Sequence, residues 1–180
     1  MRIISGEFKS RRIKSAKIEG LRPATDRYRE TLFNILNNHI DFDQIKVCDL
    51  YAGTGAVGFE CLSRGAARCV FIEKQTSVIN LLKENSTDLK VSDRVQIVNE
   101  TAERFTSFTT EKYDLIFADP PYFNFDIYKT YDNILHRKLV AEDGILIIQR
   151  SKETLNEDEV QFSKKVFKLI GDDAVYLFKF

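Results

Sequence analysis

Five short apolar segments, separated by amphipathic stretches, constrain the fold of this chain more than any other feature. All five are rich in Val, Ile, Leu and Phe, and they occupy residues 45–50, 68–73, 94–98, 113–118 and 144–149. The stretches between them have helical periodicity and begin near Ala56, Gln75, Thr101 and Asp126. Apolar strands that alternate with amphipathic helices are typical of a parallel sheet covered on both faces. The sequence therefore predicts a doubly wound α/β domain.

The C-terminal segment breaks this alternation. Residues 160–171 lead through Asp172 and Asp173 directly into the apolar residues 174–180. Two strands separated by a turn, with no helix between them, form an antiparallel hairpin. We therefore expect a Rossmann-like, mostly parallel sheet of seven strands that ends in an antiparallel hairpin.

Residues 1–20 are expected to form a basic hairpin arm, and residues 21–180 the main domain. Within the arm, residues 2–15 are typical of two short strands around a polar turn, and a hairpin this small needs support from the body or from a partner. Residues 1–30 contain nine Lys or Arg against four Asp or Glu, although the whole chain has zero net charge. A locally basic arm can contact phosphate groups.

A helix is expected directly after the arm. Pro23 precedes Thr25 and Asp26, either of which suits an N-cap. Apolar and aromatic side chains then follow at helical spacing, at Tyr28, Leu32, Ile35, Leu36 and His39. This pattern predicts an amphipathic helix that packs on the sheet.

Composition excludes several other classes of protein. The longest uncharged apolar runs are only about half as long as a bilayer crossing needs, and the first residues are too charged for the core of a signal peptide. We therefore expect a cytoplasmic protein that contacts no membrane. Cys48, Cys61 and Cys69 lack paired spacing and lie in apolar segments, and the chain has only two histidines. These features predict buried free thiols and no metal site.

A glycine-rich loop follows the first apolar strand. Its sequence, DLYAGTGAVG (residues 49–58), places Gly53, Gly55 and Gly58 in G-x-G-x-x-G spacing. Such glycines let the backbone approach a ligand beside a helix N-terminus. Glu73 ends the next strand, at the spacing where a carboxylate accepts the hydroxyls of a ribose. The pattern indicates a nucleoside but leaves open whether it donates a hydride or another group.

The fourth apolar strand ends in Asp119-Pro120-Pro121-Tyr122. Two prolines make the backbone rigid and leave carbonyl groups without neighbouring donors, at the edge of the sheet where ligands bind. The Asp119 carboxylate and the Pro120 carbonyl can accept both N–H bonds of an exocyclic amine on a flat base, aiming the nitrogen lone pair at an electrophile. Tyr122 can stack on the same base. The tetrapeptide therefore favours transfer of a group to an exocyclic amine.

Together, the glycine loop and this tetrapeptide resemble those of class I S-adenosylmethionine-dependent methyltransferases that act on exocyclic amines. The ordered segments ISGEFKSRRI, LRPATDRYRETLFNIL, DLYAGTGAVGFECLSRGA, FIEK and FADPPY resemble RsmD-type methyltransferases over essentially the whole chain. Those enzymes modify the N2 of one guanine in bacterial 16S ribosomal RNA. The resemblance implies S-adenosylmethionine as cofactor, and 16S rRNA, within a small ribosomal subunit or an assembly intermediate, as the partner of a monomeric enzyme.

The resemblance also implies roles for individual residues. Those expected at the cofactor are Asp49, Ala52, Gly53, Gly55, Glu73, Thr101 and Ala102. Those expected to handle the target base are Asp119, Pro120 and Tyr122. Those expected to contact RNA are Lys9, Arg11, Arg12, Arg22, Arg27 and Arg29. Four positions depart from the family pattern: Ser10 replaces a glycine, Tyr51 a phenylalanine, Thr101 an aspartate and Gln149 a glutamate.

Three alternatives stay open on the sequence. Methylation of adenine N6 or cytosine N4, in DNA or another RNA, uses the same chemistry of an amine held by Asp119. An NAD-dependent reductase would use the glycine loop but gives the tetrapeptide no purpose. An RNA-binding assembly factor would keep the fold without catalysis.

Overall fold

The computed structural model describes residues 1–15, 26–121 and 124–180 of the chain. In chain order its elements are α1 (Asp26–Leu36), β1 (Lys46–Leu50), α2 (Ala56–Ser63), β2 (Arg68–Glu73), α3 (Thr76–Leu89), β3 (Val95–Asn99), α4 (Ala102–Phe108), β4 (Tyr113–Ala118), α5 (Asp126–His136), β5 (Val140–Ser151), α6 (Leu155–Gln161), β6 (Lys168–Ile170) and β7 (Asp173–Lys179). The predicted alternation of strands and helices is confirmed, with β5 longer at both ends than expected.

The strands form one seven-stranded sheet in the order β3-β2-β1-β4-β5-β7-β6. Strands β1 to β5 are parallel, whereas β7 pairs antiparallel with both β5 and β6. This topology confirms the expected mixed sheet. The chain builds β2 and β3 on one side of β1 and then crosses to β4 on the other side. Ligands of open α/β sheets bind outside the carboxyl ends of the strands at such a reversal.

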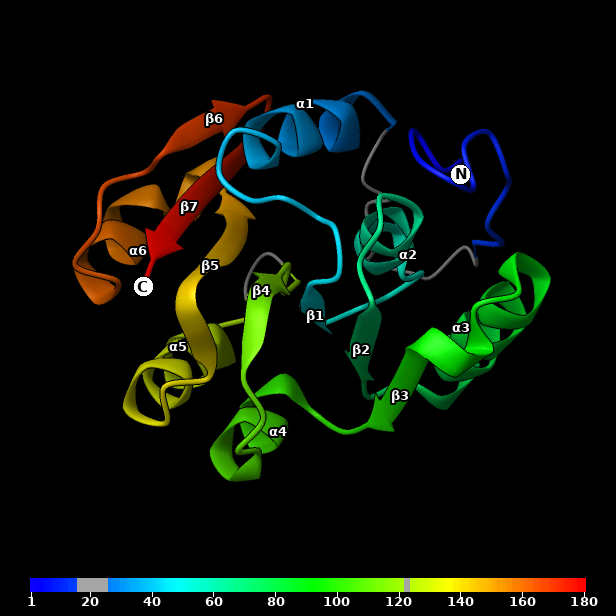
Figure 1. The fold of residues 1–180 in the computed structure, drawn as a ribbon. Coiled ribbons are helices and arrows are strands. Elements are labelled where there is room, and N and C mark those ends of the chain that lie inside the picture. Colours follow the sequence, from blue (N-terminus) through cyan, green and yellow to red (C-terminus); the bar gives the residue numbers. More distant parts are fainter. Residues whose placement is uncertain (16–25, 122–123) are drawn as a thin grey trace.

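Two helical layers cover the sheet, with α1, α2 and α3 on one face and α4, α5 and α6 on the other (Figure 1). Successive strand side chains point to opposite faces. In β4, for example, Leu115 and Phe117 join the core under the first layer, whereas Ile116 and Ala118 join the core under the second. Because both faces are covered, β1, β2 and β4 read as nearly continuous apolar runs.

Helix α1 has the predicted apolar stripe. Tyr28, Leu32 and Leu36 are buried at successive four-residue steps, and Ile35 is half-buried. The acidic Asp26 lies in the first turn, where a negative charge favours the helix dipole. His39 lies in the turn beyond the helix, not on its stripe. Thr25 lies outside the described residues.

The expectation of two regular strands within residues 2–15 is wrong. The segment has one isolated antiparallel bridge, between Arg2 and Arg12. The amides of Ile3 and Ile13 still pair across the segment, whereas the Glu60 carboxylate of α2 accepts from the amides of Ile4 at 2.7 Å and Ser5 at 2.9 Å. The segment leans on the body as expected, through the buried side chains of Ile3, Phe8 and Ile13. The proposed boundary at residue 20 falls outside the described residues and stays a prediction.

The C-terminal hairpin is shorter than expected. Its first strand covers only three residues, Lys168–Ile170, because Val160 and Gln161 belong to α6. Asp158 anchors this helix by accepting from Thr154 at 2.6 Å and from the guanidinium of Arg150 at 3.0 Å. In the ranges that the structure describes, no helix combines the length and apolarity that a membrane crossing needs.

Candidate active site

Strands β1 and β4 end side by side at the reversal point of the sheet. Leu50 lies opposite Ala118 in the parallel register of the two strands. Tyr51 and Asp119 therefore leave the sheet at the same edge and at the same level. This register brings the glycine loop and the start of the Asp-Pro-Pro-Tyr turn together, as the sequence predicts.

The glycine loop opens with two residues in left-handed conformation. Tyr51 has φ of 59° and Gly53 has φ of 52°. Between them, the amide of Ala52 donates to the carbonyl of Ile72 at 3.0 Å, which ties the loop to the end of β2. A Cβ on Gly53 would meet no atom nearer than the carbonyl oxygen of Tyr51, at 3.9 Å. The backbone at Gly53 thus faces open space, where a ligand can approach it closely.

Gly58 has a different role from Gly53. A Cβ at this position would lie 2.3 Å from a ring carbon of Phe71 and 2.6 Å from the sulfur of Cys69. Gly58 therefore allows α2 to pack closely on β2, and its amide donates to the buried Asp49 carboxylate at 3.0 Å. Burial raises the pKa of Asp49 well above its usual range, the Gly58 bond opposes the rise, and nearby Asp119 and Glu73 add to it. Asp49 consequently fixes the start of α2 beneath the loop.

The Glu73 carboxylate closes the other side of the glycine loop. Its Oε2 accepts from the Gly53 amide at 3.0 Å, and its Oε1 accepts from the amides of Lys74 and Gln75 at 2.8 and 2.9 Å. The side chain is partly exposed at the end of β2. A carboxylate has about four acceptor positions, so three backbone bonds leave room for one ribose hydroxyl. The open backbone at Gly53 and this carboxylate together fit the ribose and methionine parts of S-adenosylmethionine.

Thr101 and Ala102 lie at the start of α4, at the same edge of the sheet. The Thr101 hydroxyl accepts from the Arg104 amide at 3.2 Å and caps the helix, as threonine commonly does. Ala102 is buried in the core. The backbone of Thr101 is also engaged, because its amide donates to the Glu100 carboxylate at 2.9 Å and its carbonyl accepts from the Phe105 amide at 2.9 Å. A contact from Thr101 to the cofactor therefore stays a prediction.

Asp119 is half-buried directly after β4, and Pro120 is buried. Burial and the carboxylate of Asp173, opposed by the Arg150 guanidinium, together raise the pKa of Asp119 to about 7. A carboxyl group with this pKa changes its charge near neutral pH, as groups at functional sites often do. Tyr122 lies outside the described residues, so its stacking role stays a prediction.

A buried ion pair lies beside this turn and was not predicted from the sequence. Arg150 ends the apolar run of β5, is only 1% exposed and bonds both oxygens of Asp158, at 3.0 and 3.3 Å. The same guanidinium donates to the carbonyl of Asn124 at 3.2 Å. Tyr128 completes the cluster by donating to Asp158 at 2.8 Å. An arginine within an apolar strand was the available sign, because such a charge needs a buried partner.

The residues expected to contact RNA are placed in different environments. Lys9, Arg12 and Arg27 are exposed. Arg11 donates to the carbonyls of Asp88 and Leu89 at the end of α3, so part of its guanidinium is occupied. Arg22 lies outside the described residues.

Arg29 does not have the exposure that a contact to RNA needs. It is 0% exposed, and its guanidinium donates to the Arg2 carbonyl at 2.6 Å and to Asp26 at 2.7 Å. The expectation that it contacts phosphate is therefore not supported. Helical spacing explains the error, because Arg29 falls between Tyr28 and Leu32 on the face of α1 that packs against the core.

The three cysteines are free and buried, as expected. Burial raises the pKa of each thiol well above its usual range, which makes them poor nucleophiles. Within residues 1–15, 26–121 and 124–180, no cluster of His, Cys, Asp and Glu has the geometry of a metal site.

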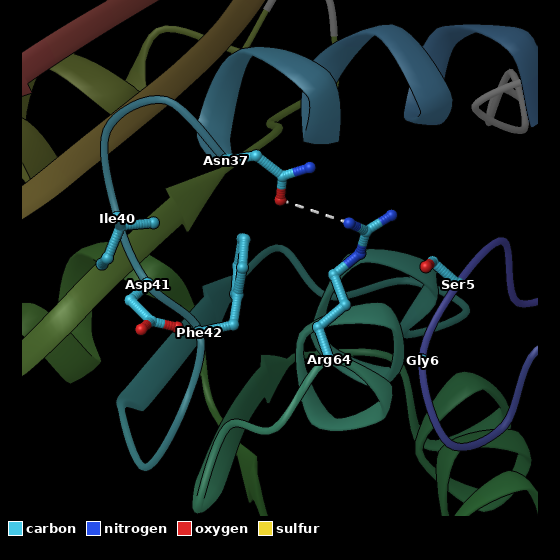
Figure 2. A pocket seen from close by; sticks show the side chains of 7 residues that line it. All are labelled: Ser5, Gly6, Asn37, Ile40, Asp41, Phe42 and Arg64. Carbon is cyan, nitrogen blue, oxygen red and sulfur yellow. Dashed lines mark hydrogen bonds between the residues drawn. The ribbon is translucent and has the colours of Figure 1, made fainter.

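A cavity of about 510 Å³ lies at the opposite edge of the sheet, away from this site. Figure 2 shows Arg64 reaching from the end of α2 toward Asn37, whose side-chain oxygen it contacts at 3.3 Å. Arg64 also binds Glu60 at 2.9 Å and lies over the ring of Phe33. Its charged group is thus already engaged, and the cavity has no residue in common with the glycine loop.

Comparisons with known proteins agree with this architecture. The Ribosomal RNA small subunit methyltransferase D of Haemophilus influenzae is 38% identical over 157 residues, covering 85% of this chain and 80% of that protein. A solved structure from Escherichia coli is 29% identical and superposes with a TM-score of 0.82, over 99% of this chain and 97% of that chain.

A more distant structure supports the fold alone. Precorrin-6y C5,15-methyltransferase of Geobacter metallireducens is 13% identical and superposes with a TM-score of 0.72, over 93% of this chain and 94% of that chain. The Rossmann-like class I fold expected from the sequence is therefore confirmed. The model of the family described as Conserved hypothetical protein 95 matches residues 1–179. The chain belongs to this family, and its resemblance to RsmD-type methyltransferases is confirmed.

Proposed function

We propose that this protein transfers a methyl group from S-adenosylmethionine to the exocyclic N2 of a guanine in 16S ribosomal RNA. Relatives named as small-subunit ribosomal RNA methyltransferases support this proposal, as does membership of their family. S-adenosylmethionine supplies an electrophilic methyl group when it is bound. The remaining chemistry falls to side chains and backbone at the carboxyl edge of the sheet.

One observation carries the proposal: the register that places Leu50 opposite Ala118. Adjacent strands lie about 4.8 Å apart, so the residues that follow them begin within reach of one small ligand. The loop after β1 suits the donor, because Gly53 faces open space beside Glu73. The turn after β4 begins with Asp119 and suits the acceptor. A donor and an acceptor are thereby held next to each other, which is the main requirement for direct transfer.

In this proposal Asp119 and Pro120 orient the amine rather than activate it by full deprotonation. The ionised Asp119 carboxylate and the Pro120 carbonyl accept the two N–H bonds of guanine N2. The nitrogen lone pair, otherwise delocalised into the ring, is then directed at the donor methyl group. As the new N–C bond formed, the bond between the methyl group and the donor sulfur would break, its electron pair would return to sulfur, and S-adenosylhomocysteine would leave. The nitrogen would gain positive charge and release one proton to solvent or to Asp119. Tyr122 would hold the base by stacking.

The RNA would reach this edge with help from basic groups on the N-terminal segment and on α1. Lys9, Arg12 and Arg27 are exposed and free to contact phosphate by charge. Three exposed cations supply only a modest positive charge, which favours a folded small subunit or an assembly intermediate over naked RNA as substrate. We further propose that the protein acts as a monomer in the cytoplasm, where such particles are assembled.

The direct test is methylation of undermodified small subunits with labelled S-adenosylmethionine, followed by nucleoside analysis. The proposal expects labelled N2-methylguanosine in 16S RNA. Labelled N6-methyladenosine or N4-methylcytidine would assign the alternative amine methylation instead. Binding to subunits without any transfer of label would favour an assembly factor.

Asp119→Ala tests the proposed roles within the site. We expect nearly complete loss of transfer, with binding of RNA and S-adenosylmethionine largely retained. Asp114 offers a matched control, because it is a half-buried aspartate at the other end of β4, where its carboxylate accepts from the Lys46 amide at 2.7 Å. Asp114→Ala should cost stability but retain transfer. Normal transfer by Asp119→Ala would refute the proposed mechanism.

A further inference from the structure

The Tyr51 hydroxyl joins the glycine loop to α5, the helix that follows the Asp-Pro-Pro-Tyr turn. It donates to the carboxylate of Asp126 at 2.7 Å and lies 3.2 Å from the hydroxyl of Thr130. Tyr51 follows β1, whereas Asp126 and Thr130 belong to α5, the helix that follows the Asp-Pro-Pro-Tyr turn. The bond therefore crosses from the donor side of the site to the acceptor side.

Asp126 is well placed to transmit this contact to the turn. Its amide donates to the side-chain oxygen of Asn124 at 3.1 Å, and the Asn124 amide donates to the Pro121 carbonyl at 2.9 Å. A short chain of hydrogen bonds thus leads from Tyr51 through α5 to Pro121. Any shift of the glycine loop relative to α5 would stretch the first bond of this chain.

The backbone conformation of Tyr51 gives the bond from its hydroxyl to Asp126 a structural role. A left-handed conformation costs a non-glycine residue about 1–2 kcal/mol, so surrounding contacts must hold it in place. Tyr51 has φ of 59°, and the next amide, that of Ala52, is tied to Ile72. Anchoring the phenol on α5 fixes the side chain, and with it the direction in which the glycine loop leaves β1.

The chemistry of the hydroxyl suits a permanent anchor. Burial and the neighbouring Asp126 raise the pKa of Tyr51 above its usual range, while Thr130 and Arg150 oppose the rise. The phenol therefore stays protonated at neutral pH and remains a donor to Asp126.

We propose that Tyr51 is a positioning residue for methyl transfer, whose hydroxyl fixes the glycine loop to α5 and so sets the separation of donor and acceptor. This inference rests on the proposed methyltransferase function. Tyr51 reaches neither reacting group in this scheme and acts through the backbone that follows it. It should therefore affect the rate of transfer more than the binding of either substrate.

Tyr51→Phe removes only the hydroxyl and is the decisive variant. A misplacement of 1 Å can reduce a rate by about a hundredfold, so a partial loosening should lower kcat by about tenfold. The KM values for S-adenosylmethionine and for subunits should stay within about twofold, because uniform binding is unchanged. Tyr51→Phe with kcat within twofold of wild type would overturn the inference.

Asp126 provides a second arm of the test. Asp126→Ala should lower kcat as much as Tyr51→Phe, and the double variant should be no slower than either single variant, because both remove one bond. Asp126→Asn retains an oxygen acceptor for the phenol and should recover most of the rate. Additive losses in the double variant would overturn the inference, since they would show two independent effects.

Tyr113→Phe is the matched control. The Tyr113 hydroxyl also donates to a carboxylate, that of Glu111, at 2.8 Å, but at the opposite end of β4. Its loss should lower the melting temperature while leaving kcat unchanged. Equal losses of kcat in Tyr113→Phe and Tyr51→Phe would show that Tyr51 acts only through the stability of the protein, and would overturn the inference. Absence of transfer by the wild-type protein would instead refute the proposed function, and this inference with it.

Discussion

The amide of Gly53 donates to Oε2 of Glu73 at 3.0 Å, so the residue that ends β2 also shapes the loop that follows β1. Glu73→Ala removes the acceptor for this amide and the proposed partner of the ribose. Loss of one charge-assisted bond to a ligand costs about 1.5–3 kcal/mol, so the Kd for S-adenosylmethionine should rise at least about tenfold. Isothermal titration calorimetry with the purified protein measures this change.

Glu111→Ala is the control for this prediction. Glu111 is a partly buried carboxylate that pairs with Lys46 at the opposite edge of the sheet. Its removal should leave the Kd for S-adenosylmethionine within about twofold of wild type, because it touches no part of the proposed site. An unchanged Kd in Glu73→Ala would exclude Glu73 from the cofactor site.

Methyl transfer should depend on pH through Asp119. Burial and Asp173 raise the pKa of this carboxyl to about 7, against the opposing Arg150. In the proposed mechanism, only the ionised carboxylate both accepts an N–H bond of the amine and stabilises the positive charge that develops on its nitrogen. At saturating substrates, kcat should therefore rise as pH increases from 6 to 8 and level off above the pKa, with a slope of about one log unit per pH unit at the acidic end. A flat profile over this range would contradict the assignment.

The same pKa has a consequence for stability. A carboxyl group whose pKa is higher in the folded than in the unfolded protein lowers the free energy of unfolding once the pH rises above the pKa of the unfolded state. This loss of stability reaches its full size above the pKa of the folded state. Asp119→Asn removes the charge and keeps the shape. It should therefore raise the melting temperature relative to wild type more at pH 8 than at pH 5, as thermal unfolding at the two pH values would show. Equal effects at both values would mean that Asp119 carries no unfavourable charge.

The sheet and the position of the candidate site at its carboxyl edge were predictable because they depend on local patterns. Runs such as residues 68–73 and 113–118 bury both faces of a strand, and this requirement leaves a continuous apolar signature in the sequence. The open backbone at Gly53 and the rigid turn at Asp119 likewise follow from residue type. These features need no knowledge of distant partners.

The remaining features depend on contacts between segments far apart in the chain. In residues 2–15, the Glu60 carboxylate binds the amides of Ile4 and Ser5, and nothing near those residues in the sequence indicates this contact. Arg150 and Asp158 likewise meet only after β5 has turned into α6. The bond from Tyr51 to Asp126 joins residues 75 positions apart. Hydrophobic periodicity carries no information about such polar contacts.

Cations of the N-terminal segment should contribute measurably to the salt dependence of RNA binding. Lys9 and Arg12 are exposed, whereas Arg11 is partly occupied by carbonyl groups of α3. Each phosphate contact contributes about one unit to the slope of log K against log salt. Lys9→Ala and Arg12→Ala should each reduce the slope by about one unit, and Arg11→Ala should reduce it by less. Filter binding of small subunits over a range of salt concentrations measures the slopes.

Lys138→Ala is the control for this measurement. Lys138 is exposed at the end of α5, on the edge of the sheet opposite the proposed site. Its removal should leave the slope unchanged, because it lies away from the proposed RNA path. Equal slopes for wild type, Lys9→Ala and Arg12→Ala would place the RNA contact elsewhere on the protein.

Ser10 carries backbone strain that a glycine would relieve. It is exposed, has φ of 68°, and its amide donates to the Ile3 carbonyl at 2.9 Å in the turn of the N-terminal segment. Glycine adopts this conformation without the steric cost of a Cβ, although it also gains freedom in the unfolded chain. Ser10→Gly should therefore raise the free energy of unfolding by about 1 kcal/mol, or the melting temperature by about 2–4 °C. Ser10→Ala keeps the Cβ and should give no gain, so equal stabilities of the glycine and alanine variants in urea unfolding would show that the turn is unstrained.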